Sequence, residues 1–180
     1  MLRGYSILDH DYRNDEQIKS IIENSKNKGI QTHVWKKSEI ENYLLIPSLV
    51  HRLVNDQLNS SGKSVSLDEI KSILFDSAGE LKQDVIAQYA EKLEHWARKN
   101  SQQMDTSTAV KTALGKIDSI WDDFDKRLSI TPGKDILKKF NQNIFSKYGV
   151  SIGIMALSSH VQEDELDDEI KQVFAELSRL

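Results

Sequence analysis

Two aspartates near the start of the chain, Asp9 and Asp11, have the residue type and spacing of a divalent-metal site. They follow a short apolar run, Gly4-Tyr5-Ser6-Ile7-Leu8, which predicts a strand that ends just before them. Side chains two residues apart in an extended chain point the same way, so the carboxylates would repel each other unless a cation, a proton or a basic group intervened. Hard oxygen ligands of this kind suit Mg²⁺ or Mn²⁺. The alternative for both residues is a turn or helix-cap role.

A second acidic segment, Glu39-Ile40-Glu41-Asn42-Tyr43-Leu44, follows the next predicted strand. Ligands of open α/β sheets bind at the carboxyl ends of the strands. Glu39 and Glu41 could therefore bring further oxygen ligands to the edge that carries Asp9 and Asp11. The competing interpretation makes Glu41 the capping-box partner of Ser38 and leaves Glu39 in solvent.

The third chemical feature is Lys134, which follows Thr131-Pro132-Gly133 in the first turn of a predicted helix. A lysine at this position opposes the helix dipole and is mildly unfavourable unless an anion lies nearby. Helix N-termini attract phosphate, and a lysine beside their free amide groups strengthens that attraction. The alternative is that Lys134 bends back into water while Asp135 supplies the favourable charge.

The elements around these residues predict an α/β protein that is predominantly helical, with a small parallel sheet at the N-terminus. The first strand, a helix capped by Asn14, a glycine stop at Gly29 and a second strand over 30–35 form a βαβ unit with a right-handed crossover. The rest of the chain shows helical periodicity. We expect helices from Pro47 to Leu58, from Leu67 to Trp96 with a bend or break at Gly79, from about Thr106 to Leu128, from Pro132 to Gly149 and from Asp164 to Leu180.

The composition narrows the class of protein. The 180 residues are 38% hydrophobic and 29% charged, with 8 glycines, 2 prolines and no cysteine, which is typical of a helix-rich globular chain without disulfides or thiolate sites. No apolar run reaches the roughly 20 residues that a membrane span needs, and no signal peptide is evident, so we expect a cytoplasmic protein. The net charge of −4 restricts nucleic-acid contact to local surfaces.

Taken in chain order, three groups of residues resemble the Toprim domain of OLD-type ATPase nucleases. They are Asp9-His10-Asp11-Tyr12-Arg13, then Glu39-Ile40-Glu41-Asn42-Tyr43-Leu44, and finally Pro132-Gly133-Lys134 followed by Lys147-Tyr148-Gly149-Val150-Ser151. The resemblance covers most of the chain, but only these motifs match closely. In that family a Toprim domain follows an ATPase domain and uses carboxylate-bound metals to cleave nucleic acid, often in defence against phage.

The resemblance implies a metal set of Asp9, Asp11, Glu39 and Glu41, binding Mg²⁺ or Mn²⁺, and a catalytic set of Lys134 and Glu41. It also implies DNA and an ATPase domain as partners. Residues 1–46 would be a partial Toprim-like unit, 47–130 a helical insertion, and 131–180 the helical part that completes the domain. A complete Toprim domain has an earlier strand followed by a glutamate, so we expect a C-terminal segment of such a nuclease, incomplete or inactive in isolation.

Two other classes of function stay open. The chain could be a non-catalytic helical module or a truncated remnant that docks on an ATPase partner or associates with a second copy of itself. A DxD-type phosphotransfer or glycosyl-transfer enzyme is the third interpretation, for which the sequence offers no supporting motif.

Overall fold

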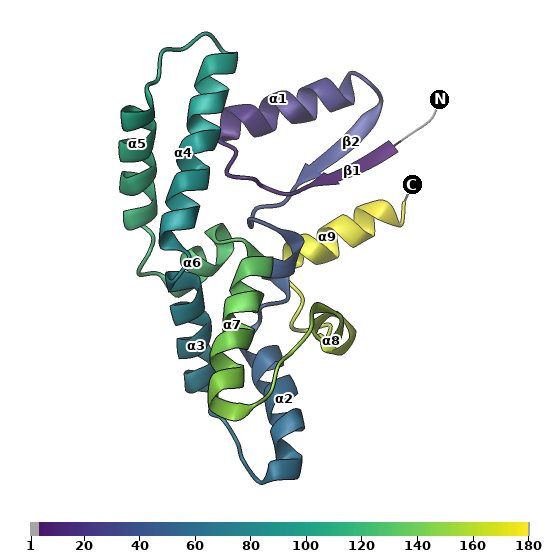
Figure 1. The fold of residues 1–180 in the computed structure, drawn as a ribbon. Helices are drawn as coiled ribbons and strands as arrows, with labels where there is room; N and C mark the ends of the chain where they lie inside the picture. Colours follow the sequence, from purple (N-terminus) through teal and green to yellow (C-terminus); the bar gives the residue numbers. More distant parts are fainter. Residues whose placement is uncertain (1–3, 180) are drawn as a thin grey trace.

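The computed structural model describes residues 4–179, which begin with the expected βαβ unit (Figure 1). Strand β1 (Gly4–Leu8) and strand β2 (Ile30–Val34) pair in parallel, with Gly4 opposite Ile30 and Leu8 opposite Val34. Helix α1 (Asp15–Lys26) connects them. Its N-cap is Asn14, whose side chain accepts a hydrogen bond from the Gln17 amide and whose own amide donates to the Gln17 side chain.

The rest of the described chain is helical. After the 3-10 helix η1 (Ile40–Tyr43) come, in chain order, α2 (Pro47–Leu58), the short η2 (Asn59–Ser61), α3 (Leu67–Gly79), α4 (Lys82–Lys99), α5 (Thr106–Asp118), α6 (Phe124–Ile130), α7 (Gly133–Tyr148), α8 (Ile154–His160) and α9 (Asp168–Leu177). This confirms a predominantly helical α/β fold with a small N-terminal parallel sheet. No helix of residues 4–179 is long and apolar enough to cross a membrane.

Three hydrophobic clusters hold these elements together. The largest joins α2 and α3 to α6, α7 and α8, and Leu49, Ile70 and Phe140 are wholly buried within it. A second cluster forms between α4 and α5, and a third packs Trp35 and Tyr43 against α9. In Figure 1, α1 and α9 lie on either side of the two strands, while α2, α3, α7 and α8 form the opposite end of the molecule.

Two of the predicted helical stretches are divided in the structure, and a third begins later than predicted. The helical stretch expected from Leu67 to Trp96 breaks after Gly79, where a bend or break was predicted. The helix expected from Thr106 to Leu128 breaks between Asp118 and Phe124, which was not predicted. A buried arginine stabilises both breaks: Arg127 donates to the carbonyl of Trp121 and to that of Phe75, and its guanidinium lies 3.3 Å from the centre of the Phe75 ring. The last helix begins at Asp168 rather than at Asp164.

Candidate functional site

The first acidic pair lies in a tight turn directly after β1. Asp11 and Tyr12 both have left-handed backbones, with φ of 50° and 58°, a conformation that costs energy for residues other than glycine. Arg13 stabilises the turn because its guanidinium donates to the carbonyls of Asp9 and His10 and forms an ion pair of 2.9 Å with Asp11. Asp11 thus departs from the extended geometry that would point it alongside Asp9.

The segment after β2 is held by a buried amide. The Asn42 side chain donates to the carbonyls of Leu128 and Thr131, at 2.6 and 2.7 Å, and accepts from the amide of Glu39 at 2.8 Å. The competing interpretation, a capping box of Ser38 with Glu41, is therefore wrong. Glu39 and Asn42 take those positions, and the Glu41 side chain does not serve as a cap.

The start of α7 completes this arrangement. Gly133 lies so close to η1 that a Cβ atom added to it would lie 2.7 Å from the amide nitrogen of Asn42. This close approach brings the Lys134 amide to 3.1 Å from Glu39 Oε2 and the Lys134 ammonium to 3.5 Å from Glu41 Oε1. The protein's own glutamates thus supply an anion beside Lys134, one of the two possibilities that the sequence left open.

The charges of the gathered residues influence one another. Burial raises the pKa of Asp9, an effect that Lys134 opposes and that Asp11 and Glu41 reinforce. Burial also raises the pKa of Glu39. The amide and the positive charge of Lys134 oppose this shift, and the negative charges of Glu41 and Asp9 reinforce it. The pKa of Lys134 is raised by Glu39 and Glu41. Asp9, Glu39, Glu41 and Lys134 are therefore close enough to act as one electrostatic unit.

One oxygen of this cluster, Oε2 of Glu41, is buried and has no hydrogen-bond partner among residues 4–179. A buried carboxylate oxygen without a partner is unfavourable, and a cation would satisfy it. As they are arranged here, however, no three histidine, aspartate or glutamate side chains of the described residues form a group that could hold a metal ion. Binding a metal would therefore require these side chains to move toward a common point.

A second buried carboxylate lies beside this region and has no counterpart in the sequence-based predictions. Glu169 of α9 accepts from the Tyr43 hydroxyl, contacts His33 Nε2 at 2.9 Å and accepts from the Lys36 amide at 3.1 Å. Burial and the bond to Glu169 raise the pKa of Tyr43. The sequence gives little indication of this network, because Glu169 resembles any acidic residue in the first turn of a helix.

Comparison with known proteins assigns the chain to no family. No family model, no curated protein and no solved structure matches the chain.

Proposed function

We propose that this chain binds Mg²⁺ or Mn²⁺ through Asp9, Glu39 and Glu41, and that the bound metal serves the hydrolysis of nucleic-acid phosphodiesters. The observation that supports this is the meeting of three carboxylates from two segments beside Lys134, with one oxygen of Glu41 buried and unpaired. Hard carboxylate oxygens are the ligands that these two ions prefer. The Toprim domain, which the motifs resemble, uses such a set for this chemistry.

The residues divide the work as follows. A divalent ion bound here would supply an activated water and offset the charge on the phosphoryl oxygens. Lys134 has a side chain that is 64% exposed, so its ammonium can turn from Glu41 toward a phosphate and stabilise the charge that develops there. Asp11 can join the metal ligands only by giving up its ion pair with Arg13.

DNA and an ATPase module as a partner belong to the same proposal, as the resemblance implies. A cytoplasmic location, expected from the composition of the chain, belongs to it as well. By the same resemblance, full activity would also require an ATPase module and the glutamate of the Toprim motif.

Thermal unfolding with and without Mn²⁺ tests the metal site. A metal present at about 100 times its dissociation constant stabilises the folded state by about 2.7 kcal/mol, which for a chain of this length raises the melting temperature by about 5–11 °C. Glu41→Gln and the double variant Asp9→Asn/Asp11→Asn should lose this rise. Glu91→Gln, which removes an exposed carboxylate on α4, is the matched control and should retain it.

An unchanged melting curve in excess Mn²⁺ would count decisively against the metal site. Cleavage is then measured with labelled single-stranded and duplex DNA in Mn²⁺, using Lys134→Gln. This variant should bind metal while losing whatever cleavage the chain shows. If Lys134→Gln cleaves as fast as the original protein, the catalytic role of this lysine is wrong.

A second candidate function, association with a partner or a second copy, is favoured by the open edge of β1. The Trp35 amide donates to the carbonyl of Leu8, so in a parallel ladder Tyr5 and Ile7 direct their backbone groups away from β2. No strand within residues 4–179 pairs with that edge, and Ile7 is 40% exposed. Open strand edges pair readily with other chains. Sedimentation should then show an assembly that Ile7→Lys dissociates, and a monomeric mass at high concentration would refute self-association.

A further inference from the structure

A cleft of about 350 Å³ lies between α1 and the second half of α4. The α4 wall carries its lining side chains at helical spacing, so all of them lie on one face. The opposite wall is formed by smaller polar and aliphatic side chains of α1. The lining includes Lys92, His95, Trp96 and Lys99 from α4, Ile21 from α1, and Arg13 from the turn before α1.

The charged lining of this cleft is basic throughout. It includes Arg13, Lys92 and Lys99 and no aspartate or glutamate. Neither Lys92 nor Lys99 forms an ion pair with a carboxylate of residues 4–179. In a chain of net charge −4, this is a local reversal of sign, and a concave surface lined by one sign of charge concentrates ions of the other.

The cleft also offers a surface for an aromatic ring. Trp96 is only partly buried and lines the cleft opposite Ile21 of α1. Nucleic-acid bases stack on such side chains without regard to sequence, while lysines and arginines nearby follow the phosphates. A cleft of this volume is suited to a group the size of a nucleotide. A base within a duplex could enter it only by leaving the base stack.

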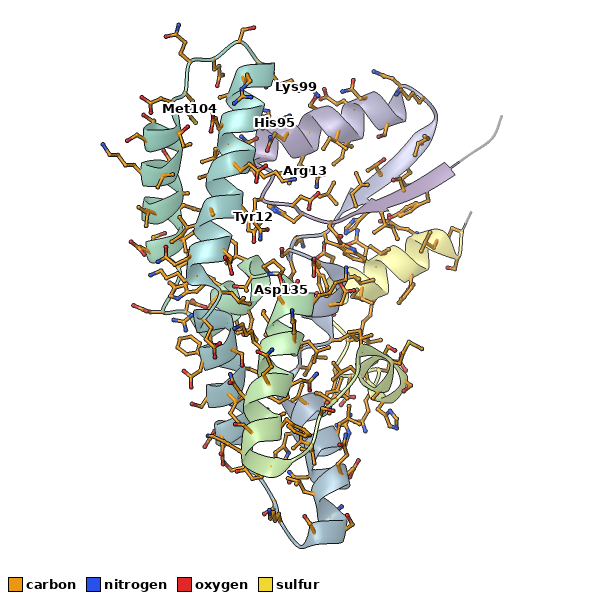
Figure 2. The ribbon with its side chains drawn as sticks, viewed as in Figure 1. Tyr12, Arg13, His95, Lys99, Met104 and Asp135 are labelled. Carbon is orange, nitrogen blue, oxygen red and sulfur yellow. The ribbon has the colours of Figure 1, made fainter. Side chains whose placement is uncertain are left out.

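The cleft leads toward the acidic cluster. Figure 2 shows Lys99, His95 and Arg13 following one another along the side of α4 that faces α1, with Tyr12 and Asp135 beyond them toward the start of α7. Arg13, at the inner end, donates to the carbonyl of Asp9 and pairs with Asp11. Asp135 adjoins Lys134 in the chain. A strand that lay along the lysines would therefore reach the carboxylates.

We propose that this cleft binds a single strand of nucleic acid, with phosphates on Lys92 and Lys99 and a base against Trp96. The inference rests on the proposed function, to which it adds the substrate class and the direction of approach. Binding needs no metal, whereas cleavage does, so the two can be tested apart.

Fluorescence anisotropy of a labelled oligothymidine of about 12 nucleotides, measured with the full chain in EDTA, tests the cleft. Lys92→Gln/Lys99→Gln should weaken binding and lower the slope of log affinity against log salt by about 1.4, the value for two lost phosphate contacts on a single strand. Trp96→Leu should weaken binding at least about fivefold. The control Lys63→Gln/Lys71→Gln removes the same charge from exposed lysines outside the cleft and should bind as the original protein does.

Three results would overturn the inference: no binding by the original chain, equal weakening in both double-lysine variants, or duplex DNA bound as tightly as the single strand. Circular dichroism of each variant checks that its helical content is kept. Binding of the oligothymidine by a chain whose melting curve Mn²⁺ does not shift would sink the proposed metal site alone, and cleavage that is indifferent to the cleft variants would sink only this inference.

Discussion

Gly133→Ala should destabilise the protein and disturb the candidate site together. The added Cβ would lie 2.7 Å from the Asn42 amide nitrogen and 3.0 Å from two atoms of Glu41, where ordinary contact begins at 3.4 Å. Two of these three atoms are backbone and cannot rotate aside, so the start of α7 must move away from η1 by about 0.7 Å. Overpacking of this kind costs about 1–3 kcal/mol, which lowers the melting temperature by about 2–4 °C for each kcal/mol.

Differential scanning calorimetry of the purified chain measures the effect. Gly115→Ala is the matched control, because this glycine lies within α5 and an added Cβ would meet nothing within 4 Å. The control should be stabilised by about 0.5–1 kcal/mol, the usual gain from replacing glycine in a helix. If Gly133→Ala melts at or above the temperature of the original protein, the close approach of α7 to η1 is wrong, and so is the placement of Lys134 beside the glutamates.

Two further predictions concern the same region. Burial raises the pKa of Glu39 above its ordinary 4.5, so there is a pH range in which the folded protein holds a proton that the unfolded chain has released. The free energy of unfolding falls as the pH rises through that range. Glu39→Gln has no such group, so its melting temperature minus that of the original protein should be larger at about pH 8 than at about pH 4. A difference that shrinks with rising pH contradicts the assignment. Asn42→Ala leaves the carbonyls of Leu128 and Thr131 without their donor and should cost about 3 kcal/mol in urea unfolding, whereas a loss below about 1 kcal/mol would mean that water replaces the amide.

The βαβ unit could be predicted from the sequence because its signals are local. The alternation over 30–35, the Asn14 cap and the stop at Gly29 each depend on neighbouring residues, and the structure has β1, α1 and β2 as expected. The meeting of Asp9 with Glu39 and Glu41 followed from a general property of parallel strands, whose carboxyl ends share one edge.

The remaining parts depend on contacts that no local pattern encodes. Lys134 reaches Glu39 only because Asn42 binds two carbonyls at the end of α6, and the sequence gives no sign of that pairing. The turn at Asp11 departs from the expected extended chain because Arg13 stabilises left-handed backbones there. The break after Asp118 depends likewise on tertiary packing around Arg127, whereas the break after Gly79 was predicted from the glycine itself.

The hydrogen bond between Lys134 and Glu39 closes a loop of 95 residues. Closing so long a loop costs conformational entropy before the contact gives anything back, so this bond should form late, once α2 to α6 have folded and shortened the distance. The βαβ unit can fold early because its strands are joined by a short connection, but its carboxylates gain their contact with Lys134 only later. In a cell, Glu39 would leave the ribosome several seconds before Lys134, since synthesis adds about 5–20 residues per second. During that time the carboxylates lack the positive charge of the lysine.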